Sequence, residues 1–275
     1  MSTFMTRTIS GAVLVAILLG LILPGGLFTL CGFYIISGIG FIELSRALDG
    51  RLSEKKVNAY EVVGLIGSGA YYAALYFHKI SQETFVIIIA VLLILMGIYV
   101  LTFPKNKCDS PVHAFFAFIY SPVLLSFIYL TRSLEGGAYI VWLIFIASWI
   151  SDTGAYLVGR SIGKHKLAPV LSPKKSIEGS VGGILSAGLI GALYGFILMK
   201  TGAMNVNLQI LIFAIIGAAG SVISQIGDLV ASGVKRDRGV KDYGKLIPGH
   251  GGVMDRFDSV IVTAPIIFFL AYYLL

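Results

Sequence analysis

Apolar residues form long, unbroken stretches along almost the whole chain, and short polar segments separate them. A helix needs about 20 consecutive apolar residues to cross the hydrocarbon core of a membrane. The stretches are continuous rather than alternating, which argues against a membrane-spanning β-barrel. The pattern predicts an all-α fold, a polytopic membrane helical bundle of about nine transmembrane helices, at residues 8–23, 25–43, 60–79, 83–103, 111–131, 137–158, 178–199, 207–231 and 255–274.

Composition supports a membrane bundle without a separate soluble domain. The 275 residues are 57% hydrophobic and 13% charged, against roughly 25% charged in a soluble domain. We expect residues 1–136, with about five spans, to act as a scaffold. We expect residues 137–275 to be the catalytic region, because the long polar loops 159–177 and 232–254 lie there.

The basic residues are distributed unevenly between the two sides that nine spans create. Of the 21 Lys and Arg residues, three lie on one side and the rest on the other; the three are Lys79, Arg132 and Lys200. Because cytoplasmic loops carry an excess of Lys and Arg, the N-terminus and both long loops are predicted to be cytoplasmic and the C-terminus external. Basic cytoplasmic loops account for the net charge of +7. We therefore expect no nucleic acid as a partner.

Glycine is frequent inside the spans, for example at Gly179, Gly182, Gly183, Gly188 and Gly191. Small residues let transmembrane helices approach closely, so we interpret these glycines as helix-packing positions. The same property could serve a subunit interface, and a homodimer is a further expectation.

The last long loop and the start of the final span, residues 232–258, combine glycines with Lys, Arg, His and Asp. Glycines let backbone N–H groups approach phosphate oxygens, and Lys and Arg neutralise them. Carboxylates in such a setting usually hold Mg²⁺ together with water and substrate phosphate. A solvated loop that binds anionic lipid headgroups is the alternative, but it leaves the sequence from His250 to Asp258 unexplained.

Three aspartates are candidate metal ligands. Asp255 and Asp258 are three residues apart at the start of the last span, hence on one helix face, although a carboxylate there can also cap the helix. Asp228 ends the preceding span, and an ionisable group at such a depth is usually functional. Asp228 and Asp255 end and begin consecutive spans at the same membrane surface, so we expect them to hold one ion. The polar residues that share the face of Asp228 are Ser221, Ser224 and Gln225.

A second polar segment follows Asp152, near the cytoplasmic end of the sixth span. Residues 173–176 have the composition of a phosphate-binding turn that opens into the seventh span. Alternatively, Glu178 forms a structural ion pair with a lysine at the membrane surface. Elsewhere, Glu43 and Arg46 are expected to form a local ion pair, and His78, His113 and His165 are interpreted as interfacial or core residues.

The stretch Ser232–Asp258 resembles the signature of the phosphatidate cytidylyltransferases, also called CDP-diglyceride synthetases, across all 27 positions. The segments 151–153, 172–175 and 227–228 are also similar to that family. The resemblance covers roughly residues 140–275, while the first five spans match only in hydropathy.

The resemblance implies the reaction CTP + phosphatidate → CDP-diacylglycerol + diphosphate, dependent on a divalent cation. Asp228 and Asp255 would then hold Mg²⁺, with Asp258 as a third ligand or an orienting group, and a second cation could lie nearby. The residues expected to offset phosphate charge or to shape the nucleotide loop are Lys235, Arg236, Lys241, His250, Gly251, Gly252 and Arg256. The expected substrate-binding residues are Asp152, Ser172, Lys174 and Lys175, and the two lysines could hold either the lipid phosphate or the triphosphate.

Two other functions stay open from the sequence. A CTP-dependent polyprenol or phytol kinase would transfer the γ-phosphoryl group instead of the cytidylyl group. An ion-coupled transporter using Asp152 and Asp228 is less favoured, because the charged groups cluster at one face rather than through the membrane. The absence of an extramembrane domain or targeting segment favours a bacterial inner membrane.

Overall fold

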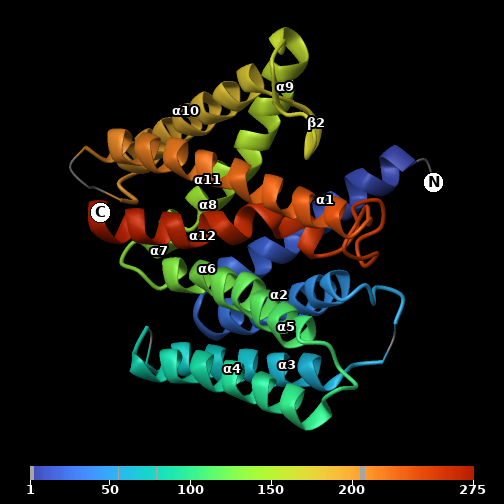
Figure 1. Ribbon diagram of the computed structural model, residues 1–275. Coiled ribbons are helices and arrows are strands. Elements are labelled where there is room, and N and C mark those ends of the chain that lie inside the picture. Colours follow the sequence, from blue (N-terminus) through green and yellow to red (C-terminus); the bar gives the residue numbers. More distant parts are fainter. Residues whose placement is uncertain (1–2, 55, 79, 205–207) are drawn as a thin grey trace. The chain divides into compact units, whose positions relative to one another are not determined.

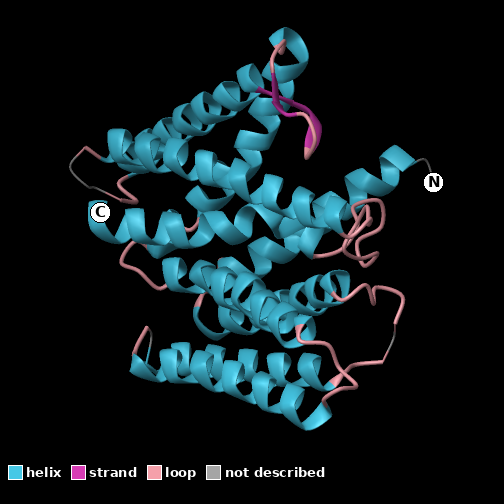
Figure 2. Cartoon of the chain, viewed as in Figure 1, coloured by secondary structure: helices cyan, strands magenta, loops and turns pink. Residues whose placement is uncertain are grey.

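The structure is a computed structural model that describes residues 3–54, 56–78, 80–204 and 208–275. Most of this chain is helical, with one short β-hairpin (Figures 1 and 2). Within the described residues, seven helical segments are long and apolar enough to cross a membrane: 26–48, 82–102, 109–132, 137–162, 177–201, 209–237 and 254–274. The predicted all-α membrane bundle is therefore confirmed.

The two other predicted spans are also helices. The first is Thr3–Ile22, whose apolar part is Thr8–Ile22, and the third is Ala59–His78. Tyrosines, glycines and Glu61 lower the mean hydropathy of the third below that of the seven. Two predicted boundaries lie outside the described residues: the end of the third span at Lys79 and the start of the eighth at residue 207. The predicted external position of Lys79 lies outside them as well.

The chain divides into two compact units. The first unit comprises Met1–Tyr129 and Asp237–Phe257, and the second Leu130–Arg236 and Asp258–Leu275. The segment 237–257, which the sequence assigned to the C-terminal region, thus belongs with the N-terminal helices.

In the first unit, α2 packs against α3, α5 and η1, and α3 packs against α4. Pro122 lies in η1, where its missing N–H interrupts the regular helical ladder. The helical elements of its N-terminal part are α1 (Thr3–Ile22), α2 (Gly26–Leu48), α3 (Ala59–His78), α4 (Gln82–Thr102), α5 (Asp109–Phe118), η1 (Ile119–Val123) and α6 (Leu124–Arg132). The first turn of α12 (Met254–Leu274), residues 254–257, also belongs to this unit.

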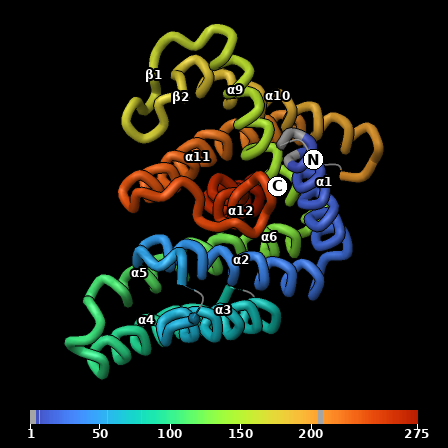
Figure 3. The backbone as a smooth tube through the Cα atoms, turned by 90° about the vertical axis from the view of Figure 1, so that its right-hand side faces the viewer, coloured from blue at the N-terminus to red at the C-terminus, as the bar shows by residue number. Residues whose placement is uncertain are grey.

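In the second unit, α9 and α10 lie side by side, and the hairpin leads from one to the other (Figure 3). A π-helical turn, η2, directly precedes α9 and Asp152; such turns are frequent at functional sites. The elements are α7 (Gly137–Ile140), α8 (Trp142–Phe145), η2 (Ile146–Ile150), α9 (Ser151–Ile162), β1 (Lys166–Ala168), β2 (Ser172–Ser176), α10 (Ile177–Thr201), α11 (Gln209–Asp237) and α12 (Met254–Leu274).

Glycines make the close packing of α10 possible, as predicted. A Cβ at Gly183 would lie 2.8 Å from the carbonyl oxygen of Ser151 in α9, and one at Gly191 would lie 2.5 Å from that of Phe213 in α11. Larger side chains would force the helices apart, because helices in lipid associate largely through such backbone approach.

The segment predicted as a phosphate-binding turn is instead strand β2. It pairs antiparallel with β1, and Lys166 lies opposite Ser176. Ser176 then caps α10, its hydroxyl accepting a hydrogen bond from the N–H of Gly179 at 3.1 Å. The two lysines therefore extend from a strand that is fixed at both ends.

Candidate active site

A cavity of about 360 Å³ lies in the second unit between α9, the hairpin, α10 and α11. It brings together four predicted site residues: Asp152, Lys174, Lys175 and Asp228. Three other wall residues, Ser176, Gly179 and Gln225, were noted in the sequence for other reasons. The sequence did not single out the rest of the wall, which is Ala155, Tyr156, Gly159, Arg160, Leu167 and Ser180.

An ion pair joins the hairpin to α11 inside this cavity. Lys175 Nζ lies 2.5 Å from Asp228 Oδ2, and both side chains are about three-quarters buried, with 24% and 28% exposed. Nζ itself is buried and, within the described part of the chain, makes no regular hydrogen bond. An ammonium carries three donors, and a buried polar group usually has a partner for them. The cavity therefore has unused capacity for an anionic ligand.

The polar face of α11 holds this cavity in place. Ser221 Oγ lies 2.7 Å from Ser151 Oγ of α9, and Gln225 Nε2 donates to the carbonyl oxygen of Ser180 in α10 at 3.1 Å. The Ser180 hydroxyl also donates to Gln225 Oε1. The predicted shared face of these residues and Asp228 is confirmed, and it fixes α9 and α10 against α11.

Asp258 lies among charged groups of the same unit, namely Asp152, Asp228 and Lys235. Its Oδ1 accepts the N–H of Ser259 at 2.8 Å. Arg236 is exposed in the last turn of α11, and Ser172 is partly buried at the start of β2; neither is in the wall of the cavity.

The other predicted site residues lie in the first unit, around the segment 237–257. A pocket of about 640 Å³ is lined there by Lys241, Asp242, Gly244, Lys245, Ile247, Pro248, Gly249, His250, Gly251 and Arg256. Its tip is a tight turn, in which Ile247 N donates to the carbonyl oxygen of Gly251 at 2.8 Å. Gly249 and Gly251 have φ values of 75° and 84°, which favour glycine.

Asp255 closes this loop, and 7% of it is exposed. Its Oδ2 accepts the N–H groups of Tyr243 at 2.8 Å and Gly252 at 3.0 Å. Arg256 Nε donates to the carbonyl oxygen of His250 at 3.1 Å, and His250 Nδ1 lies 2.7 Å from Ser10 Oγ of α1. Asp255 and Asp258 both lie in α12, as predicted. The joint binding of an ion by Asp228 and Asp255 stays a prediction.

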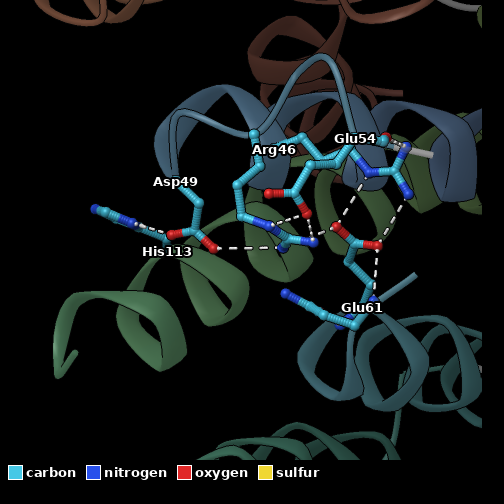
Figure 4. Close-up of polar contacts among 7 residues, drawn as sticks. Arg46, Asp49, Glu54, Glu61 and His113 are labelled. Atoms are coloured by element: carbon cyan, nitrogen blue, oxygen red, sulfur yellow. Dashed lines mark hydrogen bonds and ion pairs between the residues drawn. The ribbon is translucent and has the colours of Figure 1, made fainter. Parts of the chain in front are cut away.

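The expected ion pair between Glu43 and Arg46 is wrong. Arg46 Nε and Nη2 each donate to the buried carboxylate of Glu61 at 3.1 Å (Figure 4). Glu43 Oε2 instead accepts the N–H of Met254 at 2.8 Å. The position of Glu43, an ionisable residue inside an apolar span, could have indicated a functional role. The nearby Arg46 suggested a local ion pair instead.

The Arg46–Glu61 pair is part of a network at one end of α2 (Figure 4). Asp49 Oδ1 lies 2.6 Å from His113 Nδ1, and Arg238 Nη2 lies 3.3 Å from His113 Nε2. Because arginine can only donate, we assign the Nδ1–H tautomer, which donates to Asp49. Outside the spans, the hydrogen bond from Arg51 holds the pKa of Glu54 below its usual value.

Glu178 and His165 contact each other between α9 and α10. Glu178 accepts the N–H groups of Lys164 and His165, and it lies 2.6 Å from His165 Nδ1. The partner expected for Glu178 was a lysine side chain, so that detail is wrong. His78 is exposed at the end of α3, consistent with an interfacial position.

Across the described ranges, no group of three or more His, Cys, Asp or Glu side chains is arranged to hold a metal ion by itself. Mg²⁺ usually takes one or two protein carboxylates and completes its shell with water and substrate phosphate. Asp152 and Asp228, which share one cavity wall, have the oxygen donors that this ion prefers. The residues present therefore fit a substrate-bridged Mg²⁺.

Comparison with known proteins identifies the family. A model of the cytidylyltransferase family matches residues 5–274. The phosphatidate cytidylyltransferase of Staphylococcus saprophyticus is 32% identical over 268 residues, which cover 95% of this chain and 96% of that protein. The proteins of the same name from Staphylococcus epidermidis and Staphylococcus aureus are each 34% identical, with the same coverage. With its fold, its polar cavity and these relatives, the chain belongs to the cytidylyltransferase family.

Proposed function

We propose that this protein is an integral membrane phosphatidate cytidylyltransferase, which converts CTP and phosphatidate into CDP-diacylglycerol and diphosphate. The observation that carries the proposal is the cavity in which the buried Lys175 ammonium and the Asp228 carboxylate meet. The relatives all carry this activity in their names. A CTP-dependent lipid kinase and a transporter are not favoured, because no relative named here is called either.

The reaction requires positioning and charge neutralisation more than acid–base chemistry. The phosphate of phosphatidate is already ionised near neutral pH, so its oxygen can attack without a protein base. A bond forms between that oxygen and the α-phosphorus of CTP, while the bond from this phosphorus to the bridging oxygen of diphosphate breaks. Fixed cations stabilise the charge that develops on the phosphate oxygens.

We assign the lipid phosphate to the cavity beside the hairpin. Lys174, Lys175 and Arg160 supply cationic groups, while Ala155 and Leu167 give the wall an apolar part. Helices α9 and α10 also expose large apolar side chains, including Leu157 at 57% and Val181 at 51%. A lipid could thus keep its acyl chains in the membrane while its phosphate contacts the lysines.

The triphosphate of CTP fits the pocket of the loop 237–257 better. This pocket is made of loop residues, and its cations are Lys241, Lys245 and Arg256. Glycines leave backbone N–H groups accessible to phosphate oxygens. Lys235 and Arg236 follow Asp228 in α11 and add positive charge to the second unit.

We propose Asp228 as a Mg²⁺ ligand, with Asp152 of the same cavity wall and Asp258 as further ligands or orienting groups for this ion or a second cation; a role of Asp255 in binding the ion stays a prediction from the sequence. A bound Mg²⁺ would neutralise phosphate charge and polarise the reacting phosphate. The basic loops support a cytoplasmic active site, by the positive-inside rule. The bacterial relatives support a bacterial membrane as its location, for which we propose the inner membrane, and the positive-inside rule favours an external C-terminus.

An isotope experiment tests the reaction. Detergent-purified protein is incubated with phosphatidate, Mg²⁺ and CTP labelled separately at its α- and γ-phosphates. We expect α-label in the lipid and γ-label in diphosphate. Transfer of γ-label to the lipid would mean a kinase, and no transfer of either label would reject both activities.

A further inference from the structure

The carboxylate of Glu43 lies beneath the loop 237–257 in the first unit. Glu43 is in the membrane helix α2, 211 positions before Met254 in sequence. Its Oε2 accepts the N–H of Met254 at 2.8 Å. The group therefore contacts the point at which the loop enters α12.

Two glycines of the loop lie directly against this carboxylate. A Cβ at Gly244 would be 2.1 Å from Glu43 Oε1, and a Cβ at Gly252 would be 2.4 Å from both oxygens. Ordinary contacts of a Cβ begin near 3.4 Å. The loop thus closes tightly around Glu43, and a side chain at either position would require the Glu43 carboxylate or the loop to move.

Glu43 and Asp255 fix the same loop from two sides. Gly252 lies against Glu43 while its N–H donates to Asp255 Oδ2 at 3.0 Å. Asp255 also accepts the N–H of Tyr243, the residue before Gly244. The loop is therefore held by contacts at Tyr243 and at residues 252–254. The segment between these contacts includes Lys245 and His250, which line the pocket together with Lys241.

Packing alone gives no reason for a carboxylate at this place. A charged group within a membrane helix is costly and is usually retained for a function. The nearby arginine, Arg46, donates to Glu61 instead. The hydrogen bond described for Glu43 comes from the backbone N–H of Met254, where the loop enters α12, and a hydrocarbon side chain could not accept it.

We infer that Glu43 is a positioning residue for nucleotide binding: its carboxylate sets the geometry of the loop whose cations and N–H groups receive the triphosphate of CTP. This inference rests on the proposed function. It assigns a role in substrate binding to the N-terminal helices, which the sequence suggested to be only a scaffold.

The test is a KM and kcat comparison of Glu43→Gln with wild-type protein. Glutamine keeps the size of the side chain but replaces one accepting oxygen with a donating NH₂ group, which faces backbone donors. We expect the KM for CTP to rise at least tenfold, while the KM for phosphatidate and the melting temperature stay near wild type. Glu43→Asp keeps the charge and should restore part of the affinity. Glu83→Gln, at the N-terminal end of α4, is the matched control and should leave all these values unchanged.

A binding readout independent of turnover completes the experiment. CTP should slow tryptic cleavage at Lys241 and Lys245 in the wild type, and about tenfold more CTP should be needed in Glu43→Gln. A folded Glu43→Gln variant with wild-type KM for CTP and wild-type protection would overturn the inference. An equal rise of both KM values with a large fall in melting temperature would also overturn it, because it indicates only a structural role. If wild-type protein makes no CDP-diacylglycerol, the proposed function fails instead.

Discussion

Gly252→Ala is the substitution whose effect the structure specifies most directly. The new methyl group would lie 2.4 Å from both carboxylate oxygens of Glu43 and 2.5 Å from its Cδ. Withdrawal of the carboxylate would break its hydrogen bond with the N–H of Met254. Either this hydrogen bond is lost or the backbone of the loop moves.

The expected effect of Gly252→Ala on CTP binding has two contributions. Overpacking of a tight site costs about 1–3 kcal/mol. Movement of residue 252 also weakens the hydrogen bond from its N–H to Asp255, and a hydrogen bond to a charged group contributes about 1.5–3 kcal/mol. We expect a net loss of about 2 kcal/mol in the free energy that favours the binding-competent loop. This loss corresponds to a rise of roughly 30-fold in the KM for CTP.

Initial rates against CTP concentration, in detergent, measure this effect. Gly97→Ala in α4 is the matched control, because its Cβ would have nothing within 4 Å, and we expect an unchanged KM. The double variant Glu43→Ala/Gly252→Ala removes the obstructing carboxylate, so its loss should be smaller than the sum of the single losses. A wild-type KM for CTP in folded Gly252→Ala would refute the reasoning.

Other expected outcomes test the remaining assignments. Asp228→Asn should lower kcat by about 100-fold or more with unchanged circular dichroism, and near-normal activity would remove Asp228 from the site. Lys175→Met should raise the KM for phosphatidate by roughly tenfold to 100-fold, since a charge-assisted hydrogen bond is lost, and it should leave the KM for CTP unchanged. EDTA should abolish turnover and Mg²⁺ should restore it; activity in excess EDTA would reject a divalent cation. Exposed Cys108 should react with an impermeant maleimide in inverted vesicles and not in intact cells, and the opposite result would reverse the topology.

Some expectations failed because tertiary contacts competed with local ones. The spacing of Glu43 and Arg46 suggested an ion pair within α2, but Glu61 of α3 offers Arg46 a bidentate partner. The strand at Ser172–Ser176 is five residues long and rich in lysine. Its sequence carries little β-strand signal, since its pairing with Lys166–Ala168 supplies the stabilisation.

The sequence by itself determined the helical membrane architecture and the uneven distribution of charge, and it predicted which residues bind phosphate. These features are local: an apolar run of sufficient length must form a helix in lipid, because its backbone groups have no water to bond. The signature at Ser232–Asp258 also identified the chemistry before any contact was known.

Only the tertiary structure decided which side chains share a site. Lys175 meets Asp228 across 53 positions, and Met254 meets Glu43 across 211. Hydropathy does not encode such pairings, because apolar helix faces are interchangeable in lipid and close packing selects the neighbours. The glycines at 244 and 252 show the same limit: their spacing indicates a loop, and the carboxylate that requires them comes from a distant helix.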